Sequence, residues 1–515
     1  MLPKNKQEGI AMTDYRDLLI EATNRTHTEN GGIAYYSTLN SCLDLFASVG
    51  AMRGQDPARA KRMFLRAFSE SPDCALKILF YARDIRGGIG ERELFRSLIR
   101  ELAFTAPESV SKNLHLIPEY GRYDDLLTLL DTPCASEALD HIKQQFCKDQ
   151  LSMALGGPVS LLAKWMPSVN TSSWEKRELA KKLCRYLGLS EKKYRQSLSA
   201  LRSYIDVLEK RLCTKDYSFD YSKLPSKALF NYRKAFFRND KDRYEQFINA
   251  AAEGKEKLNT GTLAPYDIVK RCCEIRKAAL YNLCGSIQEQ DELINELNVL
   301  NTTWDALPDH TDKRNALAVI DVSGSMTAGY NSSIVPIYAA IALGIYLADK
   351  NKGFFAEHFM VFSRKARMLK LSEDTIVRKV DYILENSENE NTDLADVFSV
   401  LLRTAVENQV PQSEMPEIIY LFSDMEFDSQ RGSDKTVFEN AKAEYAANGY
   451  KLPTVVFWTI EDRHGHYPVT MDETGAVLVS GTSPMIFSMI MNSDITPVKF
   501  MAQILDSERY RNICA

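Results

Sequence analysis

The sequence has 515 residues, of which 45% are apolar and 26% are charged, the proportions of an ordinary soluble globular protein. This length predicts two to four domains. The first 15 residues contain no apolar segment of the kind that forms a secretory signal. The longest apolar run, residues 334–348, is too short to span a bilayer. Ten cysteines without a Cys-x-x-Cys pair argue against structural zinc and favour a reducing compartment. We therefore expect a cytoplasmic protein without a membrane partner.

Residues 12 to about 290 have the pattern of one helix after another. Apolar residues recur at intervals of three and four, and breakers containing glycine or proline separate the runs, for example at residues 31–33, 86–91 and 156–158. Runs of about 12 to 18 residues suit packed helix pairs, so we expect an all-helical, irregular α-solenoid of the HEAT-like kind. The sequence has no clear repeat of fixed length.

Residues 291–315 are polar and poorly periodic, and we interpret them as a linker. We predict an N-terminal extension over residues 1–34, a helical domain over 35–290, the linker over 291–315 and a final domain over 316–515. The charges support this division. Residues 313–515 carry 19 Lys+Arg against 27 Asp+Glu, a net charge of -8, whereas the preceding residues carry 45 against 42, a net charge of +3.

The pattern changes after residue 315. Short apolar runs rich in β-branched residues predict strands at residues 316–322, 357–363, 417–424 and 451–460. Helical stretches lie between them, at about 334–350, 372–386, 393–409 and 434–447. Alternating strands and helices, with strands that are apolar almost throughout, predict an α/β domain with a doubly wound parallel sheet covered on both faces. Ligands of such sheets bind beyond the carboxyl ends of the strands.

Carboxylates and hydroxyls follow two of these predicted strands. Asp321, Ser323 and Ser325 come at the end of the first strand, Asp424 ends the third, and Thr392 lies in the loop before a predicted helix. Hard oxygen ligands of this kind suit Mg²⁺, or Mn²⁺ or Ca²⁺ with looser geometry. Because Mg²⁺ keeps several waters and takes few direct protein ligands, one position would remain for an outside carboxylate or phosphate.

The spacing Asp-x-Ser-x-Ser, followed later by a Thr and an Asp, resembles the von Willebrand factor A domain and its metal-ion-dependent adhesion site. All five positions of that pattern are present in this sequence. The resemblance implies that Ser323, Ser325 and Thr392 bind the metal directly, and that Asp321 and Asp424 hold it largely through water. The alternative is an A-type domain in which the same residues only tie loops together.

The helical part carries a second resemblance. The segments "YARDIRGGIGERELF" at 81–95 and "IPEYGRYDDLL" at 117–127 are similar to the helical domain of the Ro autoantigen and telomerase-associated protein, the TROVE domain. The segments at 161–168, 194–202 and 421–428 resemble an uncharacterised branch that joins a TROVE-like domain to a C-terminal A domain. The resemblance implies a ribonucleoprotein, because Ro proteins close a ring of helical repeats around a hole and bind small structured RNAs and the ends of misfolded RNAs.

Basic residues are concentrated in two stretches of the helical part. Residues 174–202 contain nine cations against three acids, and residues 223–243 contain seven against two, with aromatic residues between them. Clustered cations neutralise phosphates, and aromatic rings stack on unpaired bases. The candidate RNA-binding residues are Lys176, Arg177, Lys181, Lys182, Arg185, Lys192, Lys193, Arg195, Arg202, Arg233, Lys234 and Arg238. The alternative is a solvated helix surface with the aromatics in the core, and the overall charge of -5 favours that alternative.

Two functions remain open on this evidence. The first is a Ro-like protein that binds small non-coding RNA, with a metal that recruits a partner or stabilises the ring. The second is a protein-interaction scaffold whose metal captures an Asp or Glu of a partner, such as an ATPase of the MoxR type. Cations that line a concave groove favour the first, and cations scattered over a convex face favour the second.

The sequence contains no pattern typical of an enzyme. "RGGIGE" at 86–91 lacks the strand and the Lys-Ser/Thr ending of a phosphate-binding loop. We find no Ser-His-Asp or Cys-His arrangement among the seven histidines, and a metal-dependent nuclease would need more carboxylates at the metal. His464 and His466 are interpreted as part of an exposed polar loop. The turns around Arg83, Asp84, Arg122 and Asp124 are interpreted as internal ion pairs that fix helix crossings. We therefore expect a binding protein and not an enzyme.

Overall fold

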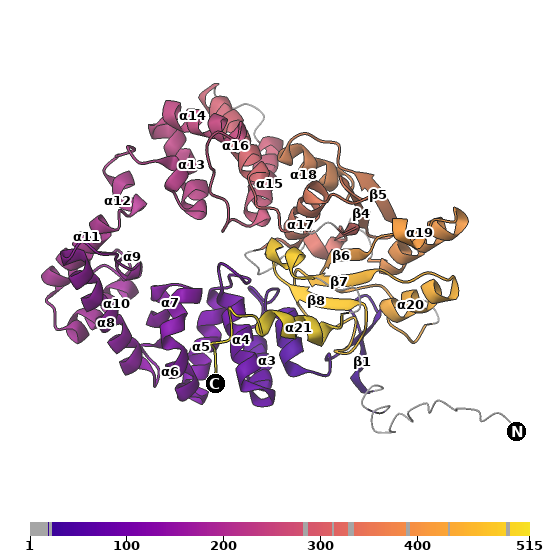
Figure 1. Ribbon diagram of the computed structural model, residues 1–515, viewed down its shortest axis with the longest axis horizontal. Coiled ribbons are helices and arrows are strands. Elements are labelled where there is room, and N and C mark those ends of the chain that lie inside the picture. Colours follow the sequence, from indigo (N-terminus) through magenta and orange to yellow (C-terminus); the bar gives the residue numbers. More distant parts are fainter. Residues whose placement is uncertain are drawn as a thin grey trace, which may run out of the picture.

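The computed structural model describes residue 19 and residues 23–281, 287–311, 314–327, 334–387, 392–430, 433–490 and 495–515. It is an arc of helices followed by an α/β unit, and both ends of the arc contact that unit (Figure 1). This is the mixed architecture that the sequence predicts. Most of residues 1–34, the expected N-terminal extension, lie outside the described residues. In the part of the chain that is described, no helix is long and apolar enough to cross a membrane.

The helical arc occupies the first three-fifths of the chain. Side chains of Asn40, Asp56, Ser173 and Ser190 accept hydrogen bonds from free N–H groups at helix starts, as good N-caps do. The helices are α2 (Ser41–Ser48), α3 (Pro57–Glu70), α4 (Pro72–Arg83), α5 (Glu93–Thr105), α6 (Pro107–Asn113), α7 (Ile117–Tyr120), α8 (Ala135–Ala154), α9 (Leu162–Trp165), α10 (Trp174–Leu187), α11 (Glu191–Tyr204), α12 (Leu208–Cys213), α13 (Ser226–Asn239), α14 (Lys241–Ala252), α15 (Pro265–Tyr281) and α16 (Ile287–Asp305).

The arc has two apolar cores. The larger core runs through α2–α11 and α15 and continues into the α/β unit. A smaller core, which includes Leu208, Phe236, Tyr244 and Val299, joins α12, α13, α14 and α16. Phe236 is fully buried there, so this aromatic residue of the second basic stretch is a core residue and not a stacking platform. The segment between α11 and α12 is therefore where the arc passes from one core to the other.

The α/β unit contains a six-stranded sheet with the order β5-β4-β3-β6-β7-β8, in which only β5 is antiparallel to its neighbour. Its strands are β3 (Ala316–Asp321), β4 (His358–Phe362), β5 (Ala366–Lys370), β6 (Ile418–Ser423), β7 (Thr454–Thr459) and β8 (Ala476–Ser480). Its helices are α17 (Pro336–Lys350), α18 (Ile376–Glu385), α19 (Leu394–Glu407), α20 (Val437–Ala447) and α21 (Pro497–Leu505). The four predicted strands and four predicted helices are confirmed, whereas β5, β8 and α21 were not predicted.

The central strands are buried on both faces. Every residue of β3 and of β6 is buried, as expected of parallel strands between two helical layers. Helix α17 packs directly on β3, and Gly344 permits this contact, since a Cβ atom there would lie 2.3 Å from the Ile320 side chain. This close packing fixes the carboxyl end of β3, where Asp321 lies.

Two segments differ from the predicted boundaries. Residues 291–305, part of the expected linker, belong to α16, which buries Val299 in the smaller core and Leu300 and Trp304 in the larger one. Residues 25–35, around the expected end of the N-terminal extension, form a hairpin of β1 (Arg25–His27) and β2 (Ile33–Tyr35) that packs on the α/β unit. Its Tyr35 pairs with Tyr467 of that unit. Local composition did not reveal either set of long-range contacts.

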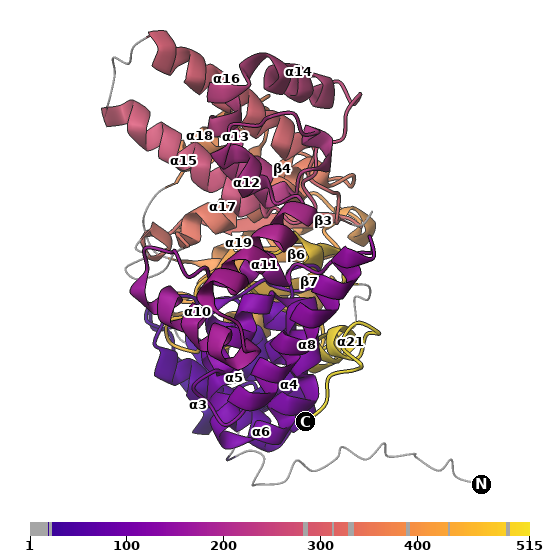
Figure 2. The same cartoon turned by 90° about the vertical axis from the view of Figure 1, so that its left-hand side faces the viewer.

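The arc meets the α/β unit at both of its ends. Helix α2 contacts β8, and α15 contacts α17 and α18 (Figures 1 and 2). Residues beyond α21 then return to the start of the arc, where Arg509 and Tyr510 reach Asp84 at the end of α4. Ala515 N–H donates to Asp73, 2.7 Å away. The path of the chain is therefore closed by contacts at three places.

Buried ion pairs hold the turns of the two TROVE-like motifs. Arg83, which is almost fully buried, donates to Asp125 at 2.8 Å, and Arg96 donates to the same carboxylate at 2.7 Å. Arg122 pairs with Asp124 at 2.9 Å and lies 4.0 Å from the centre of the Trp165 ring. The interpretation of these turns as an internal ion-pair network is confirmed.

We expect Arg509→Ala to lower the free energy of unfolding by about 3 kcal/mol, because it leaves the buried Asp84 carboxylate with fewer partners. Arg511→Ala is the matched control, since Arg511 lies two residues away and pairs with Glu508 at the surface. The side chain of Arg509 is 33% exposed and that of Arg511 is 64% exposed. Urea denaturation of both variants measures the effect, and equal midpoints would contradict it.

Candidate metal centre and basic surface

The five predicted metal-site residues lie at the carboxyl edge of the sheet. Strands β3 and β6 are hydrogen-bonded neighbours, and the chain order reverses between them, which is where doubly wound sheets bind ligands. Asp321 ends β3 and Asp424 follows β6. Thr392 precedes α19, and its carbonyl accepts a hydrogen bond from the Asp428 N–H at 3.0 Å. The fold therefore places these residues, which are distant in sequence, along one edge.

Short local hydrogen bonds order the loop after β3. The Ser323 N–H donates to Asp321 Oδ1 at 2.9 Å, and the Ser423 hydroxyl donates to Asp321 Oδ2 at 2.6 Å. The Oγ atoms of Ser323 and Ser325 are 3.1 Å apart. Asp321 and Ser323 are buried, whereas Ser325 is half-buried, so the hydroxyl of Ser325 lies nearest to solvent.

Arg463 and Asn30, which are distant in sequence and were not predicted, also reach this edge. The Arg463 guanidinium pairs with Asp424 Oδ2, and the Glu426 N–H donates to Asp424 Oδ1 at 3.2 Å. Asn30, in the turn between β1 and β2, approaches the Thr392 hydroxyl at 3.5 Å and donates to the Glu426 carbonyl at 2.6 Å. These contacts join segments separated by up to 396 positions in the sequence, so no local sequence signal reveals them.

Burial raises the pKa of both carboxylates. Burial, and then the charge of Asp424, raises the pKa of Asp321 to about 7. Burial also raises the pKa of Asp424, although the charge of Arg463 and a hydrogen bond from Ser325 partly oppose this shift. Two buried acids with one neighbouring guanidinium leave negative charge without full compensation, and a bound cation would compensate it.

The donor set fits a small divalent cation. Adjacent ligands of an octahedral Mg²⁺ lie about 3 Å apart when each is about 2.1 Å from the ion. The distance of 3.1 Å between the Ser323 and Ser325 hydroxyls matches that edge. Hydroxyl and carboxylate oxygens are also the ligand types that Mg²⁺ and Mn²⁺ accept.

The loop at 460–467 connects this edge to the helical arc. Arg59 of α3 donates to both carboxylate oxygens of Asp462 at 2.8 Å, while the adjacent Arg463 pairs with Asp424. His466 lies 3.2 Å from both oxygens of Glu426 and is half-buried. The prediction of an exposed polar loop is therefore wrong for His466, because the helices hold the loop against the sheet edge.

The first basic stretch forms an exposed surface on α10 and α11. Arg177, Lys181 and Arg185 recur every four residues and so lie along one side of α10. Among the described residues, six exposed cations of the predicted set have no ion-pair partner: Lys176, Arg177, Arg185, Lys192, Lys193 and Arg195. Lys181 is also exposed but pairs with Glu178 at 2.8 Å. We call these seven residues the α10–α11 basic surface.

Two other predicted cations of this stretch have structural contacts. Arg202 donates to the carbonyls of Ala163 and Met166 and to Ser168, at 2.7 to 2.8 Å, and so holds the segment around α9. Burial lowers its pKa. Lys182 is half-buried and donates to the Leu130 carbonyl. The local sequence does not distinguish Arg202 and Lys182 from the exposed cations, because the carbonyls that they contact belong to distant segments of the chain.

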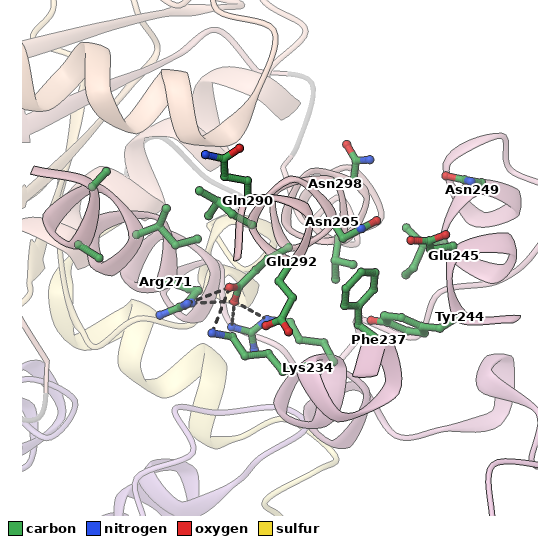
Figure 3. A pocket seen from close by; sticks show the side chains of 18 residues that line it. Lys234, Phe237, Tyr244, Glu245, Asn249, Arg271, Gln290, Glu292, Asn295 and Asn298 are labelled. Atoms are coloured by element: carbon green, nitrogen blue, oxygen red, sulfur yellow. Dashed lines mark hydrogen bonds and ion pairs between the residues drawn. The ribbon is translucent and has the colours of Figure 1, made fainter. Parts of the chain in front are cut away.

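The second basic stretch lines a pocket between α13, α14, α15 and α16 (Figure 3). Arg233 and Lys234 of α13 converge on Glu296 of α16, and Arg271 of α15 meets the same carboxylate. Arg238 is exposed and lies 4.0 Å from Glu292. The predicted residues Arg233, Lys234 and Arg238 are thus on one helix, separate from the α10–α11 basic surface.

Fold and site together define a two-part protein, a helical arc joined to a doubly wound, mostly parallel α/β unit with an acidic edge. Residues 28–152 and 134–317 match the model of a domain of unknown function, DUF2828. Residues 315–509 match a second domain of unknown function, DUF7788. The first match extends over more than half of the chain, and the chain belongs to the DUF2828 family.

Two further comparisons extend over most of the chain. The chain is 27% identical over 527 aligned residues to the uncharacterized protein L728 of Acanthamoeba polyphaga mimivirus. This alignment covers 94% of the chain and 87% of that protein. The crystal structure of the Ro (RSR) protein of Deinococcus radiodurans matches with a TM-score of 0.40 and 14% identity. That match covers 87% of this chain and 91% of the other. A TM-score of this size does not show that the two proteins share a fold.

We expect Asp321→Asn to remove a pH dependence of stability in the presence of EDTA. The folded-state pKa of Asp321 is raised, so the unfolded chain ionises first and the metal-free protein loses stability as pH rises from about 4 to about 7. Near the middle of that window the loss is about 1.4 kcal/mol per pH unit. Denaturation from pH 5 to pH 8 compares the slopes, and parallel curves would show that Asp321 does not cause the dependence.

Proposed function

We propose that this chain is an RNA-binding protein, without catalytic activity, that contacts phosphates through the α10–α11 basic surface. The observation that carries the proposal is the set of six exposed cations without ion-pair partners. Surface cations commonly pair with nearby carboxylates, as Lys181 does with Glu178. A cluster of unpaired cations attracts polyanions and gains entropy when phosphates replace bound counterions.

The position of two lysines adds to this support. Lys192 and Lys193 lie in the first turn of α11, where the positive end of the helix dipole disfavours cations by roughly 0.3–1 kcal/mol each. Arg185 lies in the last turn of α10, across the turn at Gly188. Positive charge is thus concentrated at the α10–α11 turn at a cost in helix stability, which is expected of a surface retained for binding.

The surface suits the outside of a structured RNA. Helices α10 and α11 lie at the end of the molecule far from the sheet and face the viewer in Figure 2, on the outer side of the arc. The cations are exposed on these two helices and clustered on them, not scattered over the molecule. We therefore propose contact with the phosphates of a folded, double-stranded segment, since such RNA is bound largely by shape and backbone.

We also propose that the acidic edge is a metal site of the von Willebrand factor A type that holds Mg²⁺ or Mn²⁺. Ser323, Ser325 and Thr392 would bind the ion directly, and Asp321 and Asp424 would hold it through water. A bound ion would supply positive charge to an outside carboxylate or phosphate. Burial of Asp321 and Asp424 supports the proposal, because among the residues that the structure describes the guanidinium of Arg463 does not balance two buried carboxylates.

A protein-interaction scaffold is the second candidate, and one observation favours it. The carboxylate of Glu29 already lies at this edge, 3.5 Å from His464 and 4.0 Å from Arg463. The edge thus accommodates a carboxylate from a segment outside the sheet. A partner protein could present an Asp or Glu to the same edge.

We expect the triple change Arg185→Gln, Lys192→Gln and Lys193→Gln to weaken binding to a structured RNA. The slope of log affinity against log salt should decrease by roughly 2–3, since each lost phosphate contact removes about 0.7–0.9. The control triple Lys352→Gln, Lys370→Gln and Arg511→Gln makes the same change in net charge at exposed sites elsewhere. If both triples reduce the slope equally, net charge alone is responsible and the basic surface is not the binding site.

We expect Ser323→Ala to lower Mg²⁺ affinity about tenfold or more, as measured by isothermal titration calorimetry. Ser480→Ala is the matched control, because Ser480 is a buried serine at the carboxyl end of β8 whose hydroxyl contacts the Gly50 N–H at 2.9 Å. Equal Mg²⁺ affinity in both variants would mean that Ser323 does not bind the ion.

A further inference from the structure

A well-formed pocket lies between α13, α14, α15 and α16. Its volume is about 850 Å³, within the range of small-molecule sites. Neither the acidic edge nor the α10–α11 basic surface contributes to it. Its side chains come from four helices. In Figure 3, Lys234, Arg271, Phe237 and Tyr244 lie on one side of α16, whereas Gln290 and Asn298 project from the other side.

One part of the pocket carries an excess of cations. Arg233, Lys234 and Arg271 all contact one buried carboxylate, that of Glu296. Burial acts to raise the pKa of Glu296, but hydrogen bonds and charge from Arg271 and Arg233 lower it to about 2, so the carboxylate is ionised at neutral pH. Three positive charges therefore surround Glu296, and because Arg271 also pairs with Glu274 at 3.0 Å, the excess is one positive charge. The other acids of the lining are matched, Glu292 by Arg238 at 4.0 Å and Glu245 by Lys241 at 3.8 Å.

The cations also retain hydrogen-bond donors. Each guanidinium has five N–H groups. Arg233 uses three of them on Glu296 and the Phe230 carbonyl, and Arg271 uses three on Glu296 and Glu274. Lys234 lies 3.3 Å from Glu296 with a half-exposed side chain. These remaining donors suit the oxygens of a phosphate, which accepts several charged hydrogen bonds at once.

A buried hydroxyl in the pocket has no partner. Tyr244 is buried and lines the pocket, and its hydroxyl makes no hydrogen bond to any residue that the structure describes. A buried polar group without a partner costs free energy, so such a group at a cavity wall indicates a missing ligand atom. Phe237 lies near Tyr244 in Figure 3, and Ile248 and Val299 add apolar wall. This part of the pocket suits a planar ring.

Carboxamides are the third component of the lining. Asn249 of α14 and Asn295 of α16 contribute both donors and acceptors, whereas Gln290 and Asn298 project from the other side of α16 in Figure 3. Carboxamides form paired hydrogen bonds with the edges of nucleobases. Cations for a phosphate, apolar and aromatic walls for a ring, and carboxamides for its polar edge therefore meet in one cavity.

From this combination we propose that the pocket between α13 and α16 binds a nucleoside monophosphate unit. Its phosphate lies against Lys234, Arg233 and Arg271, and its ring lies between the apolar wall and the carboxamides. A hydroxyl or base atom of the ligand accepts from or donates to Tyr244. The unit is either a free mononucleotide or the terminal nucleotide of an RNA strand. The proposal does not require the α10–α11 basic surface to bind RNA.

The experiment titrates the full chain with the four nucleoside 5′-monophosphates, with the matching nucleosides, and with a 5′-phosphorylated tetranucleotide, by calorimetry. Lys234→Met is the test variant and Lys227→Met is its control. Both lysines lie on α13, have side chains 51% and 49% exposed, and pair with one carboxylate, but only Lys234 lines the pocket. We expect one site per chain, with affinity about tenfold weaker in Lys234→Met and unchanged in Lys227→Met.

Tyr244→Phe provides a second, independent test. Because the hydroxyl has no partner in the ligand-free chain, this variant should fold with unchanged or increased stability and bind the nucleotide severalfold more weakly. Binding of a monophosphate that depends on Lys234 and Tyr244 supports a free-nucleotide site. Binding of the tetranucleotide alone, with the same dependence, supports a site for a strand end. Binding of neither ligand, or equal loss in Lys227→Met, overturns the proposal.

Failure here is distinguishable from failure of the proposed RNA function. The triple change at Arg185, Lys192 and Lys193 leaves the pocket intact, because none of these residues lines it. Monophosphate binding that survives the triple change while RNA binding is lost shows that the pocket and the basic surface are separate sites. A monophosphate affinity that falls with the triple change contradicts the placement of the nucleotide in the pocket.

Discussion

The buried carboxylate of Asp84 holds the first and last parts of the chain together. It lies at the end of α4 and accepts hydrogen bonds from Arg509 Nη2 at 2.6 Å and from the Tyr510 hydroxyl at 3.0 Å. A charge in the interior is tolerated only when it is paired and hydrogen-bonded, so these two contacts must form together with the rest of the core. They fix the segment after α21 on the arc and thereby set the position of the helices relative to the sheet.

That fixed position has consequences for the acidic edge. Arg59 of α3 holds Asp462, and the next residue, Arg463, compensates Asp424. The hairpin of β1 and β2 approaches from the other side, and Gly32 permits this contact, since a Cβ atom there would lie 2.5 Å from the Phe427 carbonyl oxygen. The edge is therefore built by the sheet, the arc and the hairpin together, and a change in any of them alters the electrostatic environment of Asp424.

The sequence alone predicts the parts of the structure that depend on local patterns. The apolar runs at β3, β4, β6 and β7 identify buried parallel strands, and their final residues place Asp321 and Asp424 at one edge. Strand β5 escaped prediction because the short segment "ARMLK" at the sheet margin has neither a continuous apolar run nor a regular alternation. Helix α16 was taken for a linker because its sequence is polar and its apolar residues, which include the exposed Leu293 and Ile294, follow no clear helical period.

Contacts between distant segments account for what could not be predicted. Arg202 and Arg195 look alike in the sequence, yet Arg202 meets carbonyls from the segment around α9 and Arg195 meets none that the structure records. The pocket around Glu296 likewise requires α13, α15 and α16 to converge. Arg233 and Glu296 are 63 positions apart in the chain. Spacing within one helix identifies a basic face, but only the packing decides which cations remain free to bind.

Photo-crosslinking to a structured RNA that contains 4-thiouridine, followed by peptide mapping, tests most directly whether this chain binds RNA through its arc. Binding as proposed predicts crosslinks in residues 174–204, with crosslinks in residues 226–249 if a strand end enters the pocket. Crosslinks confined to the α/β unit, or none above those of an RNA-free control, would contradict RNA binding by the helical arc and favour a scaffold that acts through the acidic edge.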